Sequence, residues 1–212
     1  MNLFITATDT DAGKTYVTRL LLEAFRNSGR AAAGFKPFCC GDRGDVHALH
    51  DAGAQGLTLD EINPVWLKTP ASPFAAALIE NRLLDIESVL GAFHALRQRF
   101  GQVLVEGVGG WEVPLAPQYT SADFAQELNL PVLIVVNNKL GALNHTILTV
   151  RGIQSRNMKC AGIVLNHVCA ERDSASISHR RILEDMVEVQ VIGEVMHGET
   201  DGSELLNALL QG

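Results

Sequence analysis

An eight-residue segment near the N-terminus, Thr8–Thr15 (T-D-T-D-A-G-K-T), constrains the fold of this chain more than any other feature. It follows an apolar run at 3–7 and precedes a pattern of helical period at 14–28. A buried strand, a tight loop ending in Gly-Lys-Thr and a helix form a phosphate-binding loop, because N–H groups at the helix start attract anionic oxygens. The segment therefore predicts an α/β fold that binds a nucleotide.

Two residues of this loop have defined chemical roles in the motif. Lys14 would reach the β- and γ-phosphates, and the Thr15 hydroxyl would bind Mg²⁺. The standard motif has glycine five positions before Gly13, where this chain has Thr8. The strand pattern before the loop and the helical pattern after it still favour a phosphate-binding loop over a chance Gly-Lys-Thr at a helix cap.

Composition limits the class of protein. The chain has 212 residues, 47% hydrophobic and 19% charged, so we expect a single domain over 1–212 with a sizeable core. Its net charge of -7 argues against nucleic-acid binding, which favours a basic surface. No apolar run approaches the ~18 residues of a membrane span. The first apolar run follows Met1 too closely for a signal peptide, and the four cysteines show no C-x-x-C spacing, so a cytoplasmic, reduced protein is expected.

Continuous apolar runs alternate with segments of helical period. The runs lack polar alternation, as expected for strands buried on both faces, so a mostly parallel central sheet with helices on both faces, a P-loop fold, is predicted. The expected strands are 3–7, 31–35, 102–106, 131–136, 160–165 and 189–195. The expected helices are 14–28, 73–81, 86–100, 121–128, 142–156, 175–187 and 203–211. Region 41–70 is expected to be an irregular insertion over the site, with one short helix near 45–52.

Residues that follow the apolar runs are candidates for the site, because ligands in open α/β sheets bind outside the carboxyl ends of the strands. Lys36 could neutralise charge on a transferring phosphoryl group, although a surface lysine alone is equally common. Glu106 could bind Mg²⁺, and the glycines after it would let the backbone approach a phosphate. Asp45 is a second metal candidate, although alone such a residue is more often an N-cap.

The motifs together resemble those of the dethiobiotin synthetase family. The matching stretches are T-D-T-D-A-G-K-T at Thr8–Thr15, G-F-K-P at Gly34–Pro37, V-L-V-E-G-V-G-G-W at Val103–Trp111 and K-L-G-A-L-N-H-T-I-L-T at Lys139–Thr149. The resemblance spans nearly the whole chain in the same order. The last two stretches are far more specific to the family than Gly-Lys-Thr alone.

The resemblance implies a reaction. Members of the family carboxylate 7,8-diaminononanoate with CO₂ and MgATP. One amine forms a carbamate, the γ-phosphate is transferred to it to give a carbamic-phosphoric anhydride, and the second amine closes a cyclic urea and expels phosphate. The family is homodimeric, and the segment after K-L-G helps to complete the site of the partner subunit.

The resemblance also implies a role for each matching position. Lys36, Lys14 and Thr10 would be catalytic, and Thr15, Asp45 and Glu106 would bind Mg²⁺. The nucleotide contacts would be Asp11, Ala12, Gly13, Lys14, Thr15, Tyr16, Glu106, Gly107, Val108, Gly109, Asn166 and His167. The substrate contacts would be Cys40, Gly110 and Asn144, the last of these at a helix start whose N–H groups suit a carboxylate.

This sequence differs from the family pattern at four places. Ala7 replaces a usual glycine, and Cys40 replaces a serine that contacts the substrate. The usual Asn-Asp pair at the base is Asn166-His167 here, and the usual Ile-Pro near the C-terminus is replaced within Val195–His197. The phosphate-facing residues are intact, so the differences concern the base and the substrate.

Other classes of protein share parts of the pattern. Regulatory ATPases of the partition type carry a second lysine five positions before the loop lysine, where this chain has Asp9. Relatives of the cobyrinate amidotransferases need a glutaminase domain, for which this chain is too short. A paralogue acting on a related diamine is a further alternative, because of Cys40.

Overall fold

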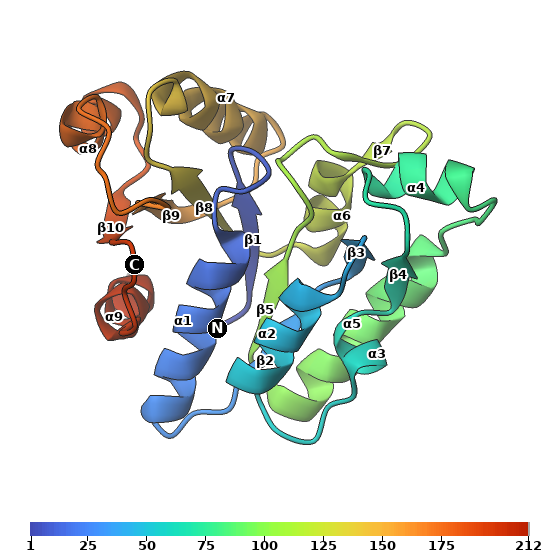
Figure 1. Ribbon diagram of the computed structural model, residues 1–212. Helices are drawn as coiled ribbons and strands as arrows, with labels where there is room; N and C mark the ends of the chain where they lie inside the picture. The colour runs from blue at the N-terminus through green and yellow to red at the C-terminus, as the bar shows by residue number, and fades with distance from the viewer. Residues whose placement is uncertain (212) are drawn as a thin grey trace.

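The central sheet contains six parallel strands. They are β1 (Leu3–Ala7), β2 (Ala33–Phe35), β5 (Val103–Glu106), β8 (Val132–Asn137), β9 (Cys160–Asn166) and β10 (Val191–Val195). Their order is β10-β9-β8-β1-β5-β2, which places β1 in the middle of the sheet (Figure 1). The structure is a computed structural model, and it describes residues 1–211.

Helices cover both faces of this sheet (Figure 1). They are α1 (Lys14–Asn27), α2 (Gly44–Ala52), α3 (Leu59–Ile62), α4 (Pro73–Ile79), α5 (Ile86–Phe100), α6 (Ser121–Leu128), α7 (Ala142–Ser155), α8 (Ser176–Met186) and α9 (Ser203–Gln211). Helix α1 packs on β1, β2 and β5 and contacts α2 and α9. Helix α5 also packs on β2 and β5, while α7 packs on β8 and β9.

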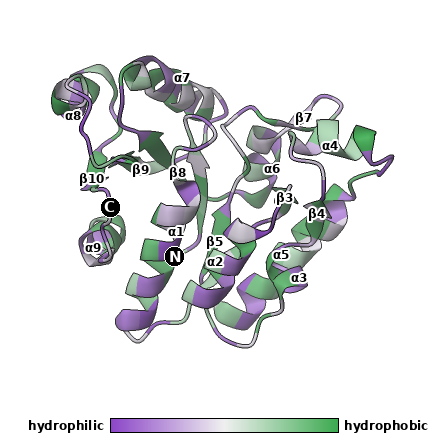
Figure 2. Cartoon of the chain, in the orientation of Figure 1, coloured by the Kyte–Doolittle hydropathy of each residue, from purple (hydrophilic) through white to green (hydrophobic). Residues whose placement is uncertain are grey.

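The strands are buried because both faces of the sheet are covered. All residues of β1 and β5 are buried, which explains why their sequences show no alternation of apolar and polar residues. Figure 2 shows the apolar residues concentrated in the strands, with polar residues on the outer parts of the helices. Phe4 on β1 and Phe25 on α1 are completely buried between these layers. The fold therefore depends on one core on each side of a single sheet.

The predicted pattern of elements is confirmed. Each of the six expected strands and seven expected helices has a counterpart, with bounds that differ by at most three residues. The expected short helix near 45–52 is α2, which begins slightly earlier, at Gly44.

The insertion at 41–70 is more regular than the sequence analysis predicted. Its strand β4 (Val65–Leu67) pairs in parallel with β3 (Phe38–Cys40), which lies just before the insertion, and a capping box between Thr58 and Glu61 begins α3. A second small sheet pairs β6 (Pro114–Ala116) with β7 (Tyr119–Thr120). Strands of three residues are too short for periodicity to detect, but T-x-x-E at Thr58 is a recognisable helix start.

Parallel strands place all their carboxyl ends at the same edge of the sheet. The phosphate loop after β1 therefore lies beside the segments that follow β2, β5, β8 and β9. Within residues 1–211, none of the helices combines the length and the apolarity that crossing a membrane requires.

Phe4→Ala should destabilise the protein by about 3–5 kcal/mol, because it leaves a cavity in the middle of the sheet. The Phe4 ring is 0% exposed and meets Trp111 edge-on, with 6.3 Å between ring centroids. Urea unfolding followed by circular dichroism measures the change. Leu83→Ala is the control, because Leu83 is 100% exposed and should leave the unfolding midpoint unchanged. Equal midpoints for Phe4→Ala and the unmutated protein would contradict this description of the core.

Candidate active site

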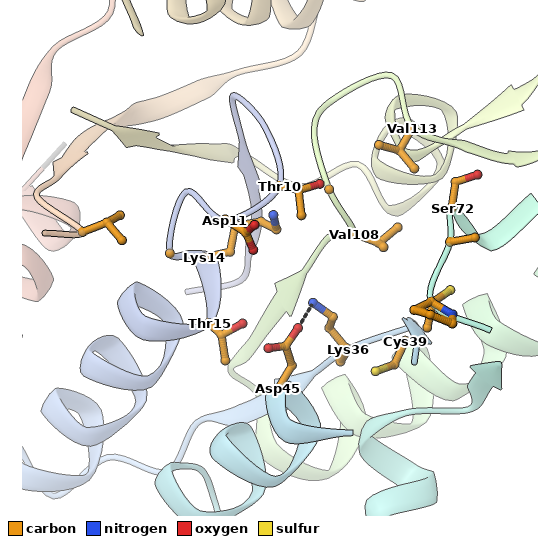
Figure 3. Close-up of a pocket in the computed structure, with 16 residues that line it drawn as sticks. Thr10, Asp11, Lys14, Thr15, Lys36, Cys39, Asp45, Ser72, Val108 and Val113 are labelled. Carbon is orange, nitrogen blue, oxygen red and sulfur yellow. Dashed lines mark hydrogen bonds and ion pairs between the residues drawn. The ribbon is translucent and has the colours of Figure 1, made fainter. Parts of the chain in front are cut away.

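Loops at the carboxyl edge of the sheet surround a cavity of about 760 Å³. Figure 3 shows the phosphate loop with Thr10, Asp11 and Lys14 on one side and Ser72 and Cys39 on the other. The lining residues are Thr10, Asp11, Gly13, Lys14, Thr15, Lys36, Cys39, Cys40, Asp45, Pro70, Ala71, Ser72, Val108, Gly109, Val113 and Val168. The topology thus brings together segments that lie far apart in the sequence.

The phosphate loop is held in place by Asn166 at the end of β9. Gly13 has φ +86°, and a Cβ atom there would lie 2.1 Å from Asn166 Nδ2, so no larger residue fits. Asn166 Nδ2 donates a 2.8 Å hydrogen bond to Ala12 O. In the described part of the chain, no side chain caps α1 at Gly13. The first N–H groups of this helix can therefore bind an anion.

Lys36 lies at the centre of a buried charged cluster. Its Nζ donates to Glu106 Oε1 at 2.5 Å, to Asp45 Oδ2 at 2.9 Å and to Gly107 O at 3.3 Å. Thr15 Oγ1 donates to the same Glu106 Oε1 at 2.7 Å. The side chains of Lys36 and Glu106 are 4% and 0% exposed. Residues from α1, α2, β5 and the segment after β2 thus meet at one point, and Figure 3 shows the contact of Lys36 with Asp45.

The two lysines of the site differ in their proton affinity. Burial alone would lower the pKa of Lys36, but the carboxylates of Glu106 and Asp45 raise it above its usual value. Burial and the nearby Lys36 lower the pKa of Lys14 to about 8. Burial would raise the pKa of Asp45, but Lys36 holds it below its usual value. Lys36 is therefore a permanent cation, whereas the charge of Lys14 would be stabilised by the negative charge of a bound anionic ligand.

Asp45 is not the N-cap of α2, so that alternative reading of the sequence is wrong. The helix begins at Gly44 with Arg43 as its N-cap, which places Asp45 in the first turn. From there its carboxylate reaches Lys36. The helix starts earlier because Asp42 Oδ1 accepts a hydrogen bond from Gly44 N at 2.7 Å.

The oxygen atoms of this cluster are suitable ligands for Mg²⁺. Within residues 1–211, Glu106 Oε2 is buried and has no hydrogen-bond partner, which is unfavourable for a carboxylate oxygen. The Thr15 hydroxyl and the Asp45 carboxylate lie beside it, both linked to Glu106 through the contacts described above. Mg²⁺ prefers oxygen ligands and takes only one or two carboxylates from a protein.

The opposite wall of the cavity is mainly apolar. It consists of Cys39, Cys40, Pro70, Ala71, Val108 and Val113. Burial, followed by the neighbouring Cys39, raises the pKa of the Cys40 thiol to about 11. The thiol is therefore neutral at pH 7 and acts as a small apolar group. This wall suits the aliphatic part of a ligand whose polar end meets the charged cluster.

Most predicted site residues lie at this cavity, but several lie elsewhere. Tyr16 Oη donates to Glu199 O, and the His167 ring is buried between Asn138 and Glu194. Ala12 and Asn166 are buried behind the phosphate loop, where they contact each other.

The two remaining substrate candidates lie near α7. Gly110 lines a second cavity of about 400 Å³ together with Trp111 and His145. Asn144 is exposed on the first turn of α7 and does not line the main cavity. Within one chain, therefore, Asn144 and Lys36 are not brought together.

The turn that closes the far side of the cavity was not predicted from the sequence. Pro70, Ala71 and Ser72 lie there, and Val113 and Val168 also contribute. The turn joins the insertion to α4 and does not follow a strand of the central sheet, so the rule about strand ends does not select it. Ser72 before Pro73 is a typical helix start, and this pattern could have indicated a turn at 70–72.

Comparisons with known proteins agree with this geometry. A family model described as an AAA domain matches residues 1–200. An ATP-dependent dethiobiotin synthetase of Akkermansia muciniphila is 46% identical over 93% of this chain and 93% of its own length. Those of Aromatoleum aromaticum and Serratia marcescens are each 38% identical, covering 92% and 78% of this chain and 89% and 76% of their own lengths.

Solved structures show the same fold at low identity. The cell division ATPase MinD of Pyrococcus furiosus has a TM-score of 0.59 at 16% identity, covering 99% of this chain and 87% of its own. A ParA family ATPase of Chlorobium tepidum has a TM-score of 0.57 at 13% identity, covering 99% and 89%. These likenesses concern the fold alone. The phosphate loop, the cluster around Lys36 and the identity over nearly the whole length lead to one conclusion: this chain belongs to the ATP-dependent dethiobiotin synthetase family.

Proposed function

We propose that the cavity binds MgATP beside 7,8-diaminononanoate and joins CO₂ to the diamine, forming dethiobiotin, ADP and phosphate. As a member of its family, the chain is a ligase that acts in biotin biosynthesis. One observation carries the assignment of the site. Lys36 lies between Glu106 and Asp45, next to Thr15 of the phosphate loop, in a cavity whose other wall is apolar.

The nucleotide would lie along the phosphate loop. Backbone N–H groups from Asp11 to Thr15 and the start of α1 suit the phosphates, and Lys14 would contact the β- and γ-phosphates. Gly107–Gly109 would lie on the far side of the γ-phosphate. The base would lie against Asn166 and the backbone of His167. Tyr16, whose hydroxyl donates a hydrogen bond to Glu199 O, would stabilise the segment that follows β10.

Thr15, Asp45 and Glu106 would hold Mg²⁺. The ion supplies charge neutralisation for the phosphates when it is bound. Glu106 Oε2, which is buried and has no hydrogen-bond partner within residues 1–211, would be one of its oxygen ligands. Lys36 would then share its carboxylates with the metal and be free to contact the γ-phosphate.

Phosphoryl transfer requires positioning and charge neutralisation more than covalent help. One amine of the diamine adds to CO₂ and loses a proton, giving a carbamate that Thr10 and Lys14 would orient. A carbamate oxygen attacks the γ-phosphorus, and the bond to ADP breaks. Lys36 would stabilise the transferring group because its charge is held in place before the reaction. The second amine then attacks the carbamoyl carbon and expels phosphate.

The diamine would extend along the apolar wall past Cys40 and, beyond Val113, which lines both cavities, toward Gly110. Asn144 lies away from the cavity of its own chain, which agrees with the proposal that Asn144 of the partner subunit contacts the substrate carboxylate in a homodimer. We also propose that the enzyme acts in the cytoplasm, where ATP is available.

A coupled assay with diaminononanoate, bicarbonate and MgATP tests this function. Formation of dethiobiotin together with stoichiometric ADP is expected. A folded sample that hydrolyses ATP or dimerises with nucleotide but forms no dethiobiotin would contradict the proposal. That result would favour a regulatory ATPase, a class represented among the structures of similar fold.

Lys14→Ala and Lys36→Met should each reduce kcat by a factor of about 10² or more, because each removes a positive charge that stabilises the transferring phosphoryl group. Circular dichroism should show the same secondary structure for both variants. Lys68→Ala is the matched control, since Lys68 is an exposed lysine that does not line the cavity. Near-normal turnover in either site variant would refute the assigned role.

Glu106→Gln should raise the Mg²⁺ concentration needed for half-maximal activity by about tenfold or more, because it removes a charged oxygen ligand. A titration of activity against Mg²⁺ at fixed ATP measures the change. Glu87→Gln on the exposed part of α5 is the control. An identical titration for Glu106→Gln and Glu87→Gln would show that Glu106 does not bind the metal.

Iodoacetamide at pH 7.5 should alkylate the exposed Cys169 well before Cys40. Cys40 reacts slowly because burial raises its pKa, and a bound diamine should slow it further. Peptide mass mapping over time measures both rates. If diaminononanoate leaves the rate at Cys40 unchanged while MgADP is present, the diamine does not lie along this wall.

A further inference from the structure

Three polar side chains are buried near the carboxyl ends of β8 and β9. Asn138 follows β8, His167 follows β9 and His179 lies on α8, and they are 4%, 4% and 3% exposed. Burying polar groups is unfavourable unless hydrogen bonds replace their contacts with water. We call these three residues the Asn138 cluster.

The Asn138 amide joins the two histidines. His179 Nδ1 donates to Asn138 Oδ1 at 2.7 Å, and Asn138 Nδ2 lies 3.3 Å from His167 Nε2. Glu194 Oε2 on β10 lies 3.2 Å from the same His167 nitrogen, and Arg180 Nε holds the other Glu194 oxygen at 2.9 Å. A chain of contacts thus runs from α8 across the ends of β8, β9 and β10.

The Asn138 cluster is connected to the phosphate loop through one residue. Asn138 N donates to Asn166 O at 2.9 Å, which continues the pairing of β8 and β9 beyond the strands. The side chain of Asn166 in turn holds Ala12 O and packs against Gly13. A shift of Asn138 would therefore move Asn166 and, through it, change the positions of Ala12 and Gly13 in the phosphate loop.

The other end of segment 138–141 leads into α7. Leu140 N donates to Asp173 Oδ2 at 2.7 Å, and Ala175 N donates to Asp173 Oδ1 at 2.9 Å. Leu140 itself is 77% exposed, so this segment is held by hydrogen bonds rather than by burial of its apolar side chain. Its position depends on Asn138 on one side and on Asp173 on the other.

We propose that Asn138 is a positioning residue that holds segment 138–141 and the start of α7 in a fixed relation to the phosphate loop, which couples binding of the nucleotide in one subunit to binding of the diamine in the site of the partner subunit. The identities of the two ligands, and the contact of α7 with the diamine, rest on the proposed function. Asn138 acts through Asn166 and Leu140, and it touches neither ligand.

Comparison of Asn138→Ala with Asn137→Ala tests the proposal. Asn137 is the neighbouring, half-buried asparagine at the end of β8. Hydrogen exchange measured by mass spectrometry should become faster at 138–143 and at 8–16 in Asn138→Ala only. Calorimetric titration with MgADP, with and without diaminononanoate, should show that the diamine tightens ADP binding in the unmutated protein, and that this factor falls about fivefold or more in Asn138→Ala.

Asp173→Ala and Asp173→Asn provide a second test that does not depend on a buried substitution. Asp173→Ala removes the acceptor for Leu140 N, whereas Asp173→Asn keeps an acceptor oxygen. Faster exchange at 138–143 and weaker coupling in Asp173→Ala, with recovery in Asp173→Asn, would support the proposal.

Two results would overturn it. One is unchanged exchange at 8–16 in Asn138→Ala. The other is an equal affinity for ADP with and without the diamine in the unmutated protein. Failure of the unmutated protein to form dethiobiotin would count against the proposed function alone, because exchange and ADP binding would still report on Asn138.

Discussion

The buried ion pair between Lys36 and Glu106 is the constraint on which the rest of this site depends. Removing two charges from water costs several kcal/mol per ion, and the cost is offset only when further hydrogen bonds surround the pair. Here Asp45, Gly107 and Thr15 provide those bonds, each from a different part of the chain. The pair can form only if β5, α1, α2 and the segment after β2 are placed correctly, so the charged cluster and the fold specify each other.

The same arrangement explains how one cavity can offer a charged surface to a phosphate and an apolar surface to an aliphatic chain. Charges fixed in a dry environment stabilise developing charge without reorganisation at the moment of reaction. The charged cluster lies on the side of the phosphate loop, while the wall at Cys40 and Val113 is apolar. A phosphate and an aliphatic diamine can therefore lie side by side with neither forced into the surroundings that suit the other.

Much of the fold and several site residues could be predicted from the sequence, and physical reasons explain why other elements and contacts could not. Buried parallel strands give continuous apolar runs, so β1, β5 and β8 were predictable, and the strand-end rule located Lys36 and Glu106. Strand β3 was too short to show a period. The contact of Asn166 with Gly13 and the Asn138 cluster depend on which strands are neighbours, and no local pattern contains that information. The position of Asp45 inside α2 depends on the hydrogen bond that Gly44 N donates to Asp42 Oδ1, which a simple capping rule does not anticipate.

Similarity of fold and similarity of site carry different information here. MinD and ParA structures share the fold at 13–16% identity, whereas a dethiobiotin synthetase is 46% identical over 93% of the chain. We propose that Lys36 contacts the γ-phosphate beside the diamine while Thr15 and Glu106 hold Mg²⁺. A crystal structure with a non-hydrolysable ATP analogue, Mg²⁺ and diaminononanoate tests it most directly. Lys14 and Lys36 Nζ should both lie about 3 Å from γ-phosphate oxygens, with the metal on Thr15 and Glu106. A triphosphate bound away from Lys36, with Lys36 still paired to Glu106, would contradict the account.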